Sequence, residues 1–221
     1  MRAAAGSTPS RPMALSVAEP FAMPRLACPE EPHGTLHVVQ RGLARSACFS
    51  CACDHAAYLE ALRECAARAG CAVHAFALMG NHVHLLVTSA RAGGAARLMP
   101  AIAARYARHL AAAYGHEEAL WEEPYDATPV HVRAHLFSCM RYIEENPVRA
   151  GLAAHPGEYP WSSYRANALG EESALVTPHP HYYSLGRSPE ARRAAYAALF
   201  LRAAETGRKL RRPSGAATSR D

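Results

Sequence analysis

Residues 78–87 read Leu-Met-Gly-Asn-His-Val-His-Leu-Leu-Val, and this stretch decides the fold. Gly80-Asn81 is a turn signal typical of a β-hairpin, and it separates two apolar runs that we expect to pair as strands. Alternate residues of a strand share a face, so His82 and His84 point the same way while the residues between them face the core. Two imidazoles at this spacing can reach one divalent metal ion. The alternative is a pair of strand histidines exposed to water.

Outward from this stretch, the apolar periodicity predicts alternating strands and helices. The expected elements are a strand over 34–42, a helix over 54–69, strands over 71–79 and 82–88, a helix from Gly93-Gly94 to about 114, and a helix over about 132–146 halted by Pro147. The poorly patterned stretch 116–130 is where a fourth strand would fit. This order predicts an α+β fold: a ferredoxin-like or RRM-like split βαβ sandwich with an antiparallel sheet, plus a helical C-terminal extension.

Composition divides the chain into four parts. Residues 1–22 are rich in Ala, Ser and Pro and are predicted to be a disordered arm, which makes Met23 an alternative start. Residues 23–165 are predicted to form the main domain, and residues 166–206 a helical extension with a helix beginning near 187. Residues 207–221 are predicted to be a disordered basic tail.

The overall composition excludes several classes of protein. Half of the 221 residues are hydrophobic and 19% are charged, which is typical of a folded core. No apolar run approaches the roughly 18 residues of a membrane span, and the N-terminus lacks the apolar region of a secretory signal, so we expect a cytoplasmic protein. The formal charge of +5 comes almost wholly from Arg, since Lys209 is the only lysine. Arginine suits phosphate groups, but Arg and Ala are also frequent wherever a genome is GC-rich.

The seven cysteines are an odd number, and reduced thiols are the expectation without a secretory signal. Cys48, Cys51 and Cys53 form a tight cluster that would be able to hold zinc together with Cys65 or Cys71. A zinc site normally shows a second close pair of ligands, which is missing here. Buried or simply reduced thiols are therefore the favoured interpretation.

The predicted helix before Pro147 carries a second chemical feature. An apolar stripe runs along it, and Tyr142 and Asn146 lie one turn apart on the flank of that stripe. The tyrosine hydroxyl is a candidate nucleophile that needs activation, and the asparagine carbonyl is a candidate third metal ligand. The alternative is ordinary amphipathic packing with Asn146 as a helix-ending residue.

Several motifs together resemble a known family, the single-tyrosine HUH transposases of the insertion-sequence-200-like group. Residues 78–87 resemble the HUH signature, and residues 141–152, Arg-Tyr-Ile-Glu-Glu-Asn-Pro-Val-Arg-Ala-Gly-Leu, resemble the tyrosine helix. Residues 159–164, Tyr-Pro-Trp-Ser-Ser-Tyr, resemble the segment that follows in the REP-associated tyrosine transposase branch, and residues 36–42 also match in style. The resemblance covers about residues 23–185.

The resemblance implies a role for each matching residue. His82 and His84 take the places of the paired metal ligands for Mg²⁺ or Mn²⁺, Asn146 that of a residue completing the metal shell, and Tyr142 that of the nucleophile. In the family this tyrosine attacks single-stranded DNA near a hairpin and leaves a 5′-phosphotyrosine bond and a free 3′-OH. The sequence leaves open whether the protein is a monomer or a homodimer, and whether the tyrosine acts in its own subunit or in a partner's. The cellular setting that the resemblance implies is the prokaryotic nucleoid.

Candidate DNA contacts lie around the tyrosine helix. Arg141 and Arg149 flank this helix and are placed to meet phosphates, and Trp161 or Tyr164 would stack on an unpaired base. Trp161 is equally a candidate core residue. The predicted DNA-binding set is completed by two further arginines, Arg41 and Arg165.

One stretch departs from the family pattern. Relatives usually continue with a Gly-Arg-aromatic-Lys run after the Leu-Trp-Glu segment, but residues 123–126 here read Glu-Pro-Tyr-Asp, and residues 117–126 are acidic. An acidic surface beside a DNA path repels phosphates. The leading hypothesis is therefore a DNA-cleaving and rejoining enzyme, with a non-catalytic hairpin-DNA-binding relative as the alternative. A metal-dependent hydrolase that uses water as its nucleophile is a third interpretation.

Overall fold

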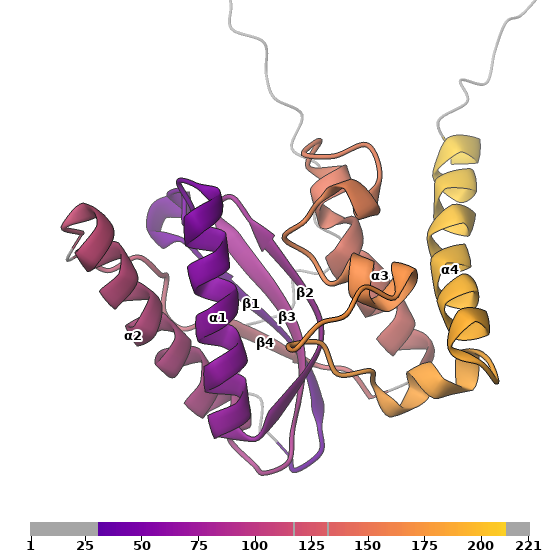
Figure 1. The fold of residues 1–221 in the computed structure, drawn as a ribbon, viewed down its shortest axis with the longest axis horizontal. Coiled ribbons are helices and arrows are strands. Elements are labelled where there is room, and N and C mark those ends of the chain that lie inside the picture. Colours follow the sequence, from indigo (N-terminus) through magenta and orange to yellow (C-terminus); the bar gives the residue numbers. More distant parts are fainter. Residues whose placement is uncertain (1–30, 117, 132, 211–221) are drawn as a thin grey trace, which may run out of the picture.

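The computed structural model describes residues 31–116, 118–131 and 133–210. Its centre is a four-stranded antiparallel sheet of β1 (Thr35–Arg41), β2 (Cys71–Met79), β3 (His82–Ser89) and β4 (Asp126–Pro129). The strand order is β2-β3-β1-β4, so β3 lies between the two strands that a helix connects (Figure 1). This is the split βαβ arrangement expected from the sequence.

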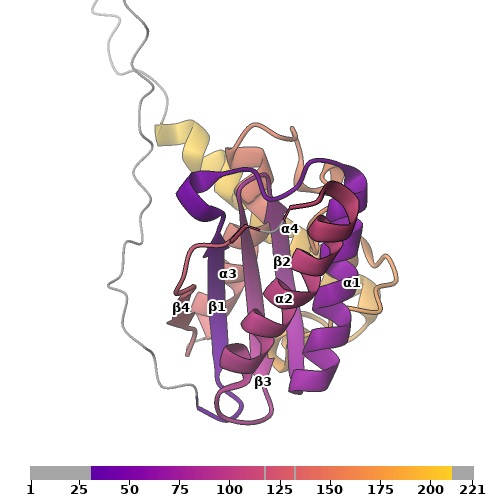
Figure 2. The ribbon, with the colours of Figure 1, turned by 90° about the vertical axis from the view of Figure 1, so that its left-hand side faces the viewer.

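Helices cover both faces of the sheet. The helices α1 (Ala52–Ala69) and α2 (Gly94–Tyr114) lie on one face (Figure 2). On the other face lie α3 (Arg133–Arg149) and α4 (Pro189–Leu210) (Figure 1). Alternate side chains of β3 therefore pack into two different cores. Val83, Leu85 and Val87 join the core under α1 and α2, whereas Leu86 joins the core under α3. The predicted α+β sandwich is confirmed.

The chain after α3 returns along the outer edge of β2. It carries the short helices η2 (Pro156–Glu158), η3 (Arg165–Leu169) and η4 (Pro180–Leu185). The Leu78 amide donates to the Trp161 carbonyl at 2.9 Å, and the Ser163 amide donates to the Phe76 carbonyl at 3.0 Å. The Asn167 side chain donates to the His74 carbonyl at 2.9 Å. The edge of β2 is thereby occupied by the chain itself.

Two predicted helix ends were wrong. α3 continues through Pro147 to Arg149, because proline in the last turn removes one hydrogen bond without preventing the next residues from bonding: the Ala150 amide still donates to the Asn146 carbonyl at 2.9 Å. Gly151, with φ of 73°, follows this helix in the left-handed conformation. α4 runs to Leu210, past the predicted end at 206.

Other expectations concern the chain ends and membranes. The predicted arm over 1–22 and most of the predicted tail, residues 211–221, lie outside the described residues. Within the described part of the chain, no helix combines the length and the apolar character needed to cross a bilayer. The fourth strand fell inside the poorly patterned stretch, at Asp126–Pro129, and pairs with β1.

The cysteines differ from the expectation in one respect. Cys51 and Cys53 form a disulfide, whereas Cys48, Cys65 and Cys71 are buried and outside any disulfide. A spacing motif predicts proximity but carries no information on oxidation state, so reduced thiols were the wrong expectation for this pair. Among the described residues, Cys51 and Cys53 cluster with Asp54 and without Cys65 or Cys71, and their sulfurs are bonded to each other instead of being thiolates that could hold zinc.

Candidate active site

The predicted histidines and tyrosine meet between β3 and α3. His82 and His84 point to the same face of β3, with ring centroids 4.9 Å apart. The Tyr142 ring approaches His84 edge-on at 5.7 Å. Tyr142 reaches this place because Leu136, Met140 and Ile143, on the neighbouring face of α3, are buried against the sheet. The amphipathic stripe of α3 therefore sets the position of the tyrosine.

A third histidine, His37, belongs to this cluster and was not assigned a role from the sequence. Its Nε2 lies 3.0 Å from Nδ1 of His84, and its ring lies 6.0 Å from that of Tyr142. In the register of β1 on β3, Val39 is opposite His84, which makes His37 a diagonal neighbour. Reading 34–42 with a period of two would have placed His37 and Arg41 on one face.

Hydrogen bonds orient the two predicted ligand rings. His37 engages Nδ1 of His84, and the Asn81 Oδ1 lies 2.7 Å from Nδ1 of His82. In both rings this partner meets Nδ1, and in His84 it leaves Nε2 as the nitrogen on the other side of the ring. Partners of this kind fix the ring orientation and tautomer of metal-binding histidines.

The electrostatics of the cluster favour neutral imidazoles. Burial lowers the pKa of His84 well below its ordinary value, and the nearby His37, His82 and Arg41 act in the same direction. Burial also lowers the pKa of His37 to about 4. Neutral imidazole is the form that ligates metal ions.

Asn146 lies one turn after Tyr142 on α3. Its side-chain nitrogen donates to the Tyr142 carbonyl at 2.9 Å, so the amide oxygen is the atom left for another partner. Two imidazole nitrogens and one amide oxygen form a donor set that suits a divalent cation. The chemistry of these atoms suits the metal that the sequence implied, while their joint coordination of one ion stays a prediction.

Two of the predicted DNA-binding arginines lie at this cluster. The guanidinium of Arg149 is exposed and lies 5.4 Å from the centre of the Tyr142 ring. Arg41 ends β1 directly opposite His82. Both positive groups are thus at the end of the sheet where the histidines lie.

Arg141 and Arg165 are engaged elsewhere. Arg141 donates to the Leu199 carbonyl of α4 at 3.2 Å and lies 3.9 Å from the Glu145 carboxylate. Arg165 donates to the Gly157 carbonyl at 2.9 Å within the segment that follows α3. The structure does not bring these two side chains to the tyrosine.

The two predicted stacking residues also pack within the protein. Tyr164 is only 3% exposed and lies edge-on to Phe200 at 4.8 Å, so its ring has no open face for a base. Its assignment as a stacking residue was wrong, because the sequence does not show which aromatic side chains α4 will cover. Trp161 is half-buried and stacks on His55 at 4.7 Å, in agreement with the alternative of a packing residue.

A buried carboxylate, Glu144, ties α3 to the C-terminal extension and was missed in the sequence. Its oxygens accept hydrogen bonds from the Ser163 hydroxyl, from the Asn167 amide at 2.8 Å and from the Tyr196 hydroxyl at 2.8 Å. Complete burial raises the pKa of Glu144 to about 7, although these three bonds act to lower it. The only sign of this burial in the sequence was the position of Glu144 next to the apolar stripe of the helix.

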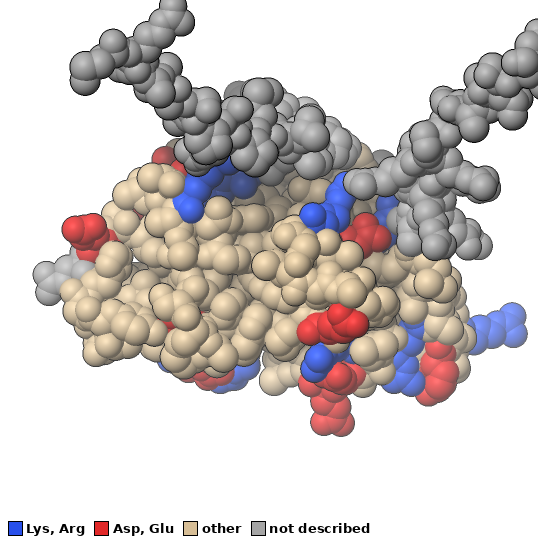
Figure 3. All heavy atoms as spheres, turned by 90° about the horizontal axis from the view of Figure 1, so that it is seen from above, with Lys and Arg blue, Asp and Glu red and all other residues tan. Residues whose placement is uncertain are grey.

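The acidic segment runs beside the same end of β1. The Glu122 amide donates to the Arg41 carbonyl at 2.8 Å, and the Leu43 amide donates to the Leu120 carbonyl at 2.7 Å. Glu118 and Glu123 are exposed, and Glu117 lies outside the described residues. On the face seen in Figure 3, the described acidic and basic groups are mixed and separated by uncharged areas. Charge alone therefore does not mark a DNA path on that face.

A cavity of about 370 Å³ opens beside His82. Its apolar lining includes Phe49, Met79 and Leu152, and the turn Gly80-Asn81 forms part of its wall. Arg45 also borders it. The histidine face thus adjoins a hollow with both apolar and cationic groups.

The sheet thus presents a His-x-His pair on β3 to a tyrosine-bearing helix, α3. The chain belongs to the IS200-like transposase family: the family described as "Transposase IS200 like" matches residues 32–146, more than half of the chain. That range includes the histidine strand and α3 through Asn146. The family identification made from the motifs is confirmed.

One solved structure supports the fold. A REP-associated tyrosine transposase bound to a REP hairpin is similar with a TM-score of 0.57 and 14% identity, over 71% of this chain and 93% of that one. A putative transposase from Deinococcus radiodurans has a TM-score of 0.39 and 20% identity, over 50% and 88% of the two chains. No functionally curated protein matches the sequence significantly.

Proposed function

We propose that this member of the IS200-like family cleaves and rejoins single-stranded hairpin DNA through a covalent 5′-phosphotyrosine at Tyr142. The observation that carries the proposal is the edge-on contact between Tyr142 and His84, on the strand face that also holds His82. A metal-dependent hydrolase would need no tyrosine beside its histidines. The contact therefore favours the tyrosine as nucleophile over water.

The chemistry assigns separate tasks to the residues. The Tyr142 oxygen attacks the phosphorus, the Oη–P bond forms, and the P–O3′ bond breaks to leave a free 3′-OH. Because the phosphotyrosine is itself a phosphodiester, a second 3′-OH can reverse the step and rejoin the strand without ATP. His82, His84 and Asn146 would hold Mg²⁺ or Mn²⁺, which supplies Lewis-acid polarisation of the phosphate when bound.

The neighbouring groups prepare this chemistry. His37 and Asn81 fix the orientation of His84 and His82 through their Nδ1 atoms. The Arg149 guanidinium packs over the Tyr142 ring, and its N–H groups are suited to a phosphate oxygen. The ring and the positive charge are therefore held together before DNA binds.

The proposed partner is a DNA hairpin with a single-stranded flank. Support comes from the fold shared with a transposase whose structure contains a REP hairpin. Within this chain, Arg41 and Arg149 are the predicted contacts that lie at the histidine cluster. Because Tyr142 reaches His84 within a single chain, the proposal is cleavage in cis.

A second candidate function is hairpin binding without cleavage. The acidic segment beside Arg41 favours it, because carboxylates there weaken the approach of a phosphate to the site. This interpretation keeps the fold and the arginines but gives Tyr142 no covalent role.

The deciding experiment is to incubate the full chain with a labelled single-stranded hairpin and Mn²⁺ and then to denature it. A labelled band that survives denaturation and disappears after protease treatment supports the proposed enzyme. Retarded DNA in a native gel with no covalent band supports the binding protein. Cleaved DNA without a covalent band would support the hydrolase.

A further inference from the structure

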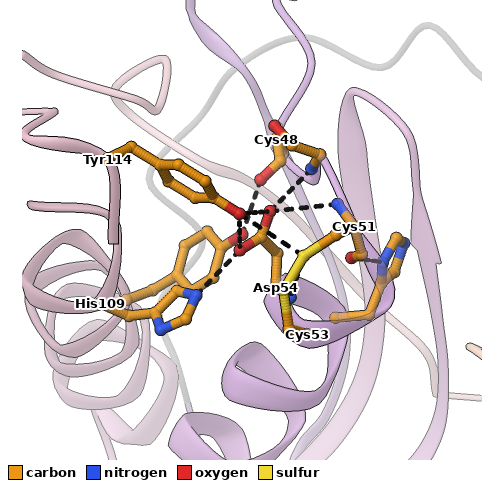
Figure 4. The surroundings of a disulfide bond; sticks show 9 residues. Cys48, Cys51, Cys53, Asp54, His109 and Tyr114 are labelled. Atoms are coloured by element: carbon orange, nitrogen blue, oxygen red, sulfur yellow. Dashed lines mark hydrogen bonds and ion pairs between the residues drawn. A yellow bond between two sulfur atoms is a disulfide. The ribbon is translucent and has the colours of Figure 1, made fainter. Parts of the chain in front are cut away.

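A disulfide between Cys51 and Cys53 lies at the N-terminus of α1, and the proposed DNA chemistry makes no use of it (Figure 4). Cys51 is the N-cap residue and is half-buried, while Cys53, in the first turn, is exposed. We propose that Cys51 and Cys53 are a reversible redox site that exchanges with low-molecular-weight thiols and disulfides such as glutathione.

The short separation argues against a purely structural bond. A disulfide stabilises a fold mainly by closing a loop of the unfolded chain, and the effect grows with loop length. Only one residue lies between Cys51 and Cys53, so closing this loop restricts the unfolded chain very little. The Cys51–Cys53 disulfide therefore adds little to the stability of the fold, so the protein can lose and re-form this bond without unfolding.

The local fold does not depend on the bond. Asp54 completes a capping box at the start of α1, and its carboxylate accepts from the amides of Ser50 at 2.8 Å and Cys51 at 3.3 Å. From α2, His109 lies 2.8 Å from the Asp54 carboxylate and the Tyr114 hydroxyl donates to it at 3.0 Å (Figure 4). These bonds remain when the disulfide opens, so α1 keeps its cap and its link to α2.

The two sulfurs have different roles in the exchange. Exposed Cys53 is the sulfur that an incoming thiolate can reach, and Cys51 is the leaving group. The Asp54 amide donates to the Cys51 sulfur at 3.3 Å, and the helix N-terminus favours negative charge there. The Asp54 carboxylate lies near Cys51, but hydrogen bonds from Ser50, His109 and Tyr114 already compensate its negative charge. Asp54 therefore disfavours a Cys51 thiolate less than an uncompensated carboxylate would.

The exchange balances without a further reactant. A first thiolate bonds to the Cys53 sulfur, the S–S bond breaks, and Cys51 leaves as a thiolate that takes up a proton. A second thiolate attacks the external sulfur of the mixed disulfide and releases Cys53. Two small thiols are thus oxidised to one disulfide while the protein gains two thiols.

Cys48 and Cys139 are poorly suited to this chemistry. Burial raises the pKa of both Cys48 and Cys139 to about 12, although a backbone hydrogen bond acts to lower that of Cys48. The thiolate is the nucleophile in exchange, so these two groups are inert by comparison. Cys139, far along the sequence in α3, is the matched control.

The test equilibrates the full chain in glutathione buffers over a wide range of reduced-to-oxidised ratios, followed by acid quenching, denaturing alkylation and peptide mass spectrometry. Cys51 and Cys53 should change together, in one reversible transition, from linked to doubly alkylated. Cys139 should be alkylated throughout. If the pair stays linked at every ratio, or is alkylated at every ratio, the redox site is refuted.

Two single variants test the direction of attack. Cys51→Ser keeps an N-capping side chain and leaves Cys53, which should form a mixed disulfide with oxidised glutathione. Cys53→Ser leaves Cys51, which should react roughly tenfold more slowly because it is half-buried. The Cys139→Ser control should leave the transition unchanged. Equal or faster reaction at Cys51 would overturn the assignment of Cys53 as the attacked sulfur.

Discussion

The Tyr142 ring stands edge-on to the His84 imidazole, with ring centroids 5.7 Å apart and ring planes at 89°. This contact joins the tyrosine helix to the histidine strand within one chain. Any change that moves α3 against β3 therefore alters the distance between the proposed nucleophile and the proposed metal ligands.

Tyr142→Phe should abolish the covalent DNA adduct. Phenylalanine keeps the ring that packs against His84 and lies under Arg149, but it lacks the oxygen that attacks phosphorus. Folding, metal binding and hairpin binding should therefore be retained. Denaturing electrophoresis and peptide mapping of the trapped wild-type adduct provide the measurement. An adduct mapped to Tyr106, Tyr114 or Tyr125, or full cleavage by the variant, would refute the assignment.

His82→Ala should weaken Mn²⁺ binding while leaving the fold intact. The His82 ring is half-buried and held by Asn81, so its removal deletes a proposed ligand without opening the main core. Isothermal calorimetry with Mn²⁺ should show at least a roughly tenfold loss of affinity. His135→Ala, an exposed histidine on α3, serves as the control. Unchanged affinity in a double His82→Ala, His84→Ala variant would contradict the metal site.

His37→Phe should weaken metal binding through its effect on His84. Phenylalanine preserves the ring contacts but removes the nitrogen that lies 3.0 Å from Nδ1 of His84. Loss of such an outer partner typically costs 10–100-fold in metal affinity, so roughly this loss is expected in the calorimetric titration. A His37→Gln variant, which restores a polar group, should recover part of it. Equal affinities in all three proteins would exclude the positioning role.

Arg149→Ala should reduce the salt dependence of hairpin binding. An arginine that contacts one phosphate contributes about one unit to the slope of log affinity against log salt. Fluorescence anisotropy at several salt concentrations measures this slope. Arg165→Ala is the comparison, because Arg165 donates to the Gly157 carbonyl instead of facing the site. The role of Arg149 in phosphate contact is wrong if both variants keep the wild-type slope.

Glu144→Gln should change how stability depends on pH. Burial raises the pKa of Glu144 from 4.5 to about 7, so the folded state holds a proton that the unfolded state releases. The contribution of Glu144 to stability is thus complete below pH 4.5 and is lost as pH rises through about 7. Relative to wild type, the variant should gain up to about 3 kcal/mol between those values, from 1.36 kcal/mol per pKa unit.

Urea unfolding at a series of pH values measures the effect of Glu144→Gln. Exposed Glu118 provides the matched variant, Glu118→Gln, whose stability curve should run parallel to that of the wild type. A Glu144→Gln curve that is also parallel would mean that the pKa of Glu144 is the same in the folded and unfolded protein, and it would contradict the prediction.

Local patterns were sufficient to predict most of the fold. Gly80-Asn81 marked the hairpin, and the bounds of β2 followed directly from the apolar run that precedes it. The period of two placed His82 and His84 on one face, and the helical stripe placed Tyr142 beside the core. These features depend on neighbours in sequence, so a single sequence contains them.

The remaining features depend on contacts between distant segments. His37 meets His84 only because of the register of β1 on β3. Glu144 is buried because Ser163, from the segment after α3, and Tyr196, from α4, bond to it, and α4 also covers Tyr164 through Phe200. No local pattern records which segment will cover a helix, and for that reason Tyr164 was mistaken for an exposed stacking residue.

The segment after α3 that lines β2, residues 161–167, has a consequence for solubility. An uncovered edge strand offers unpaired amides and carbonyls to other molecules and is a common starting point for aggregation. Here Trp161, Ser163 and Asn167 occupy the outward groups of Leu78, Phe76 and His74, and the opposite edge is the four-residue β4. A protein shortened to end before Trp161 would expose the long apolar edge of β2 and should associate through strand pairing. By occupying the edge of β2, this segment prevents the strand from pairing with a strand of another molecule.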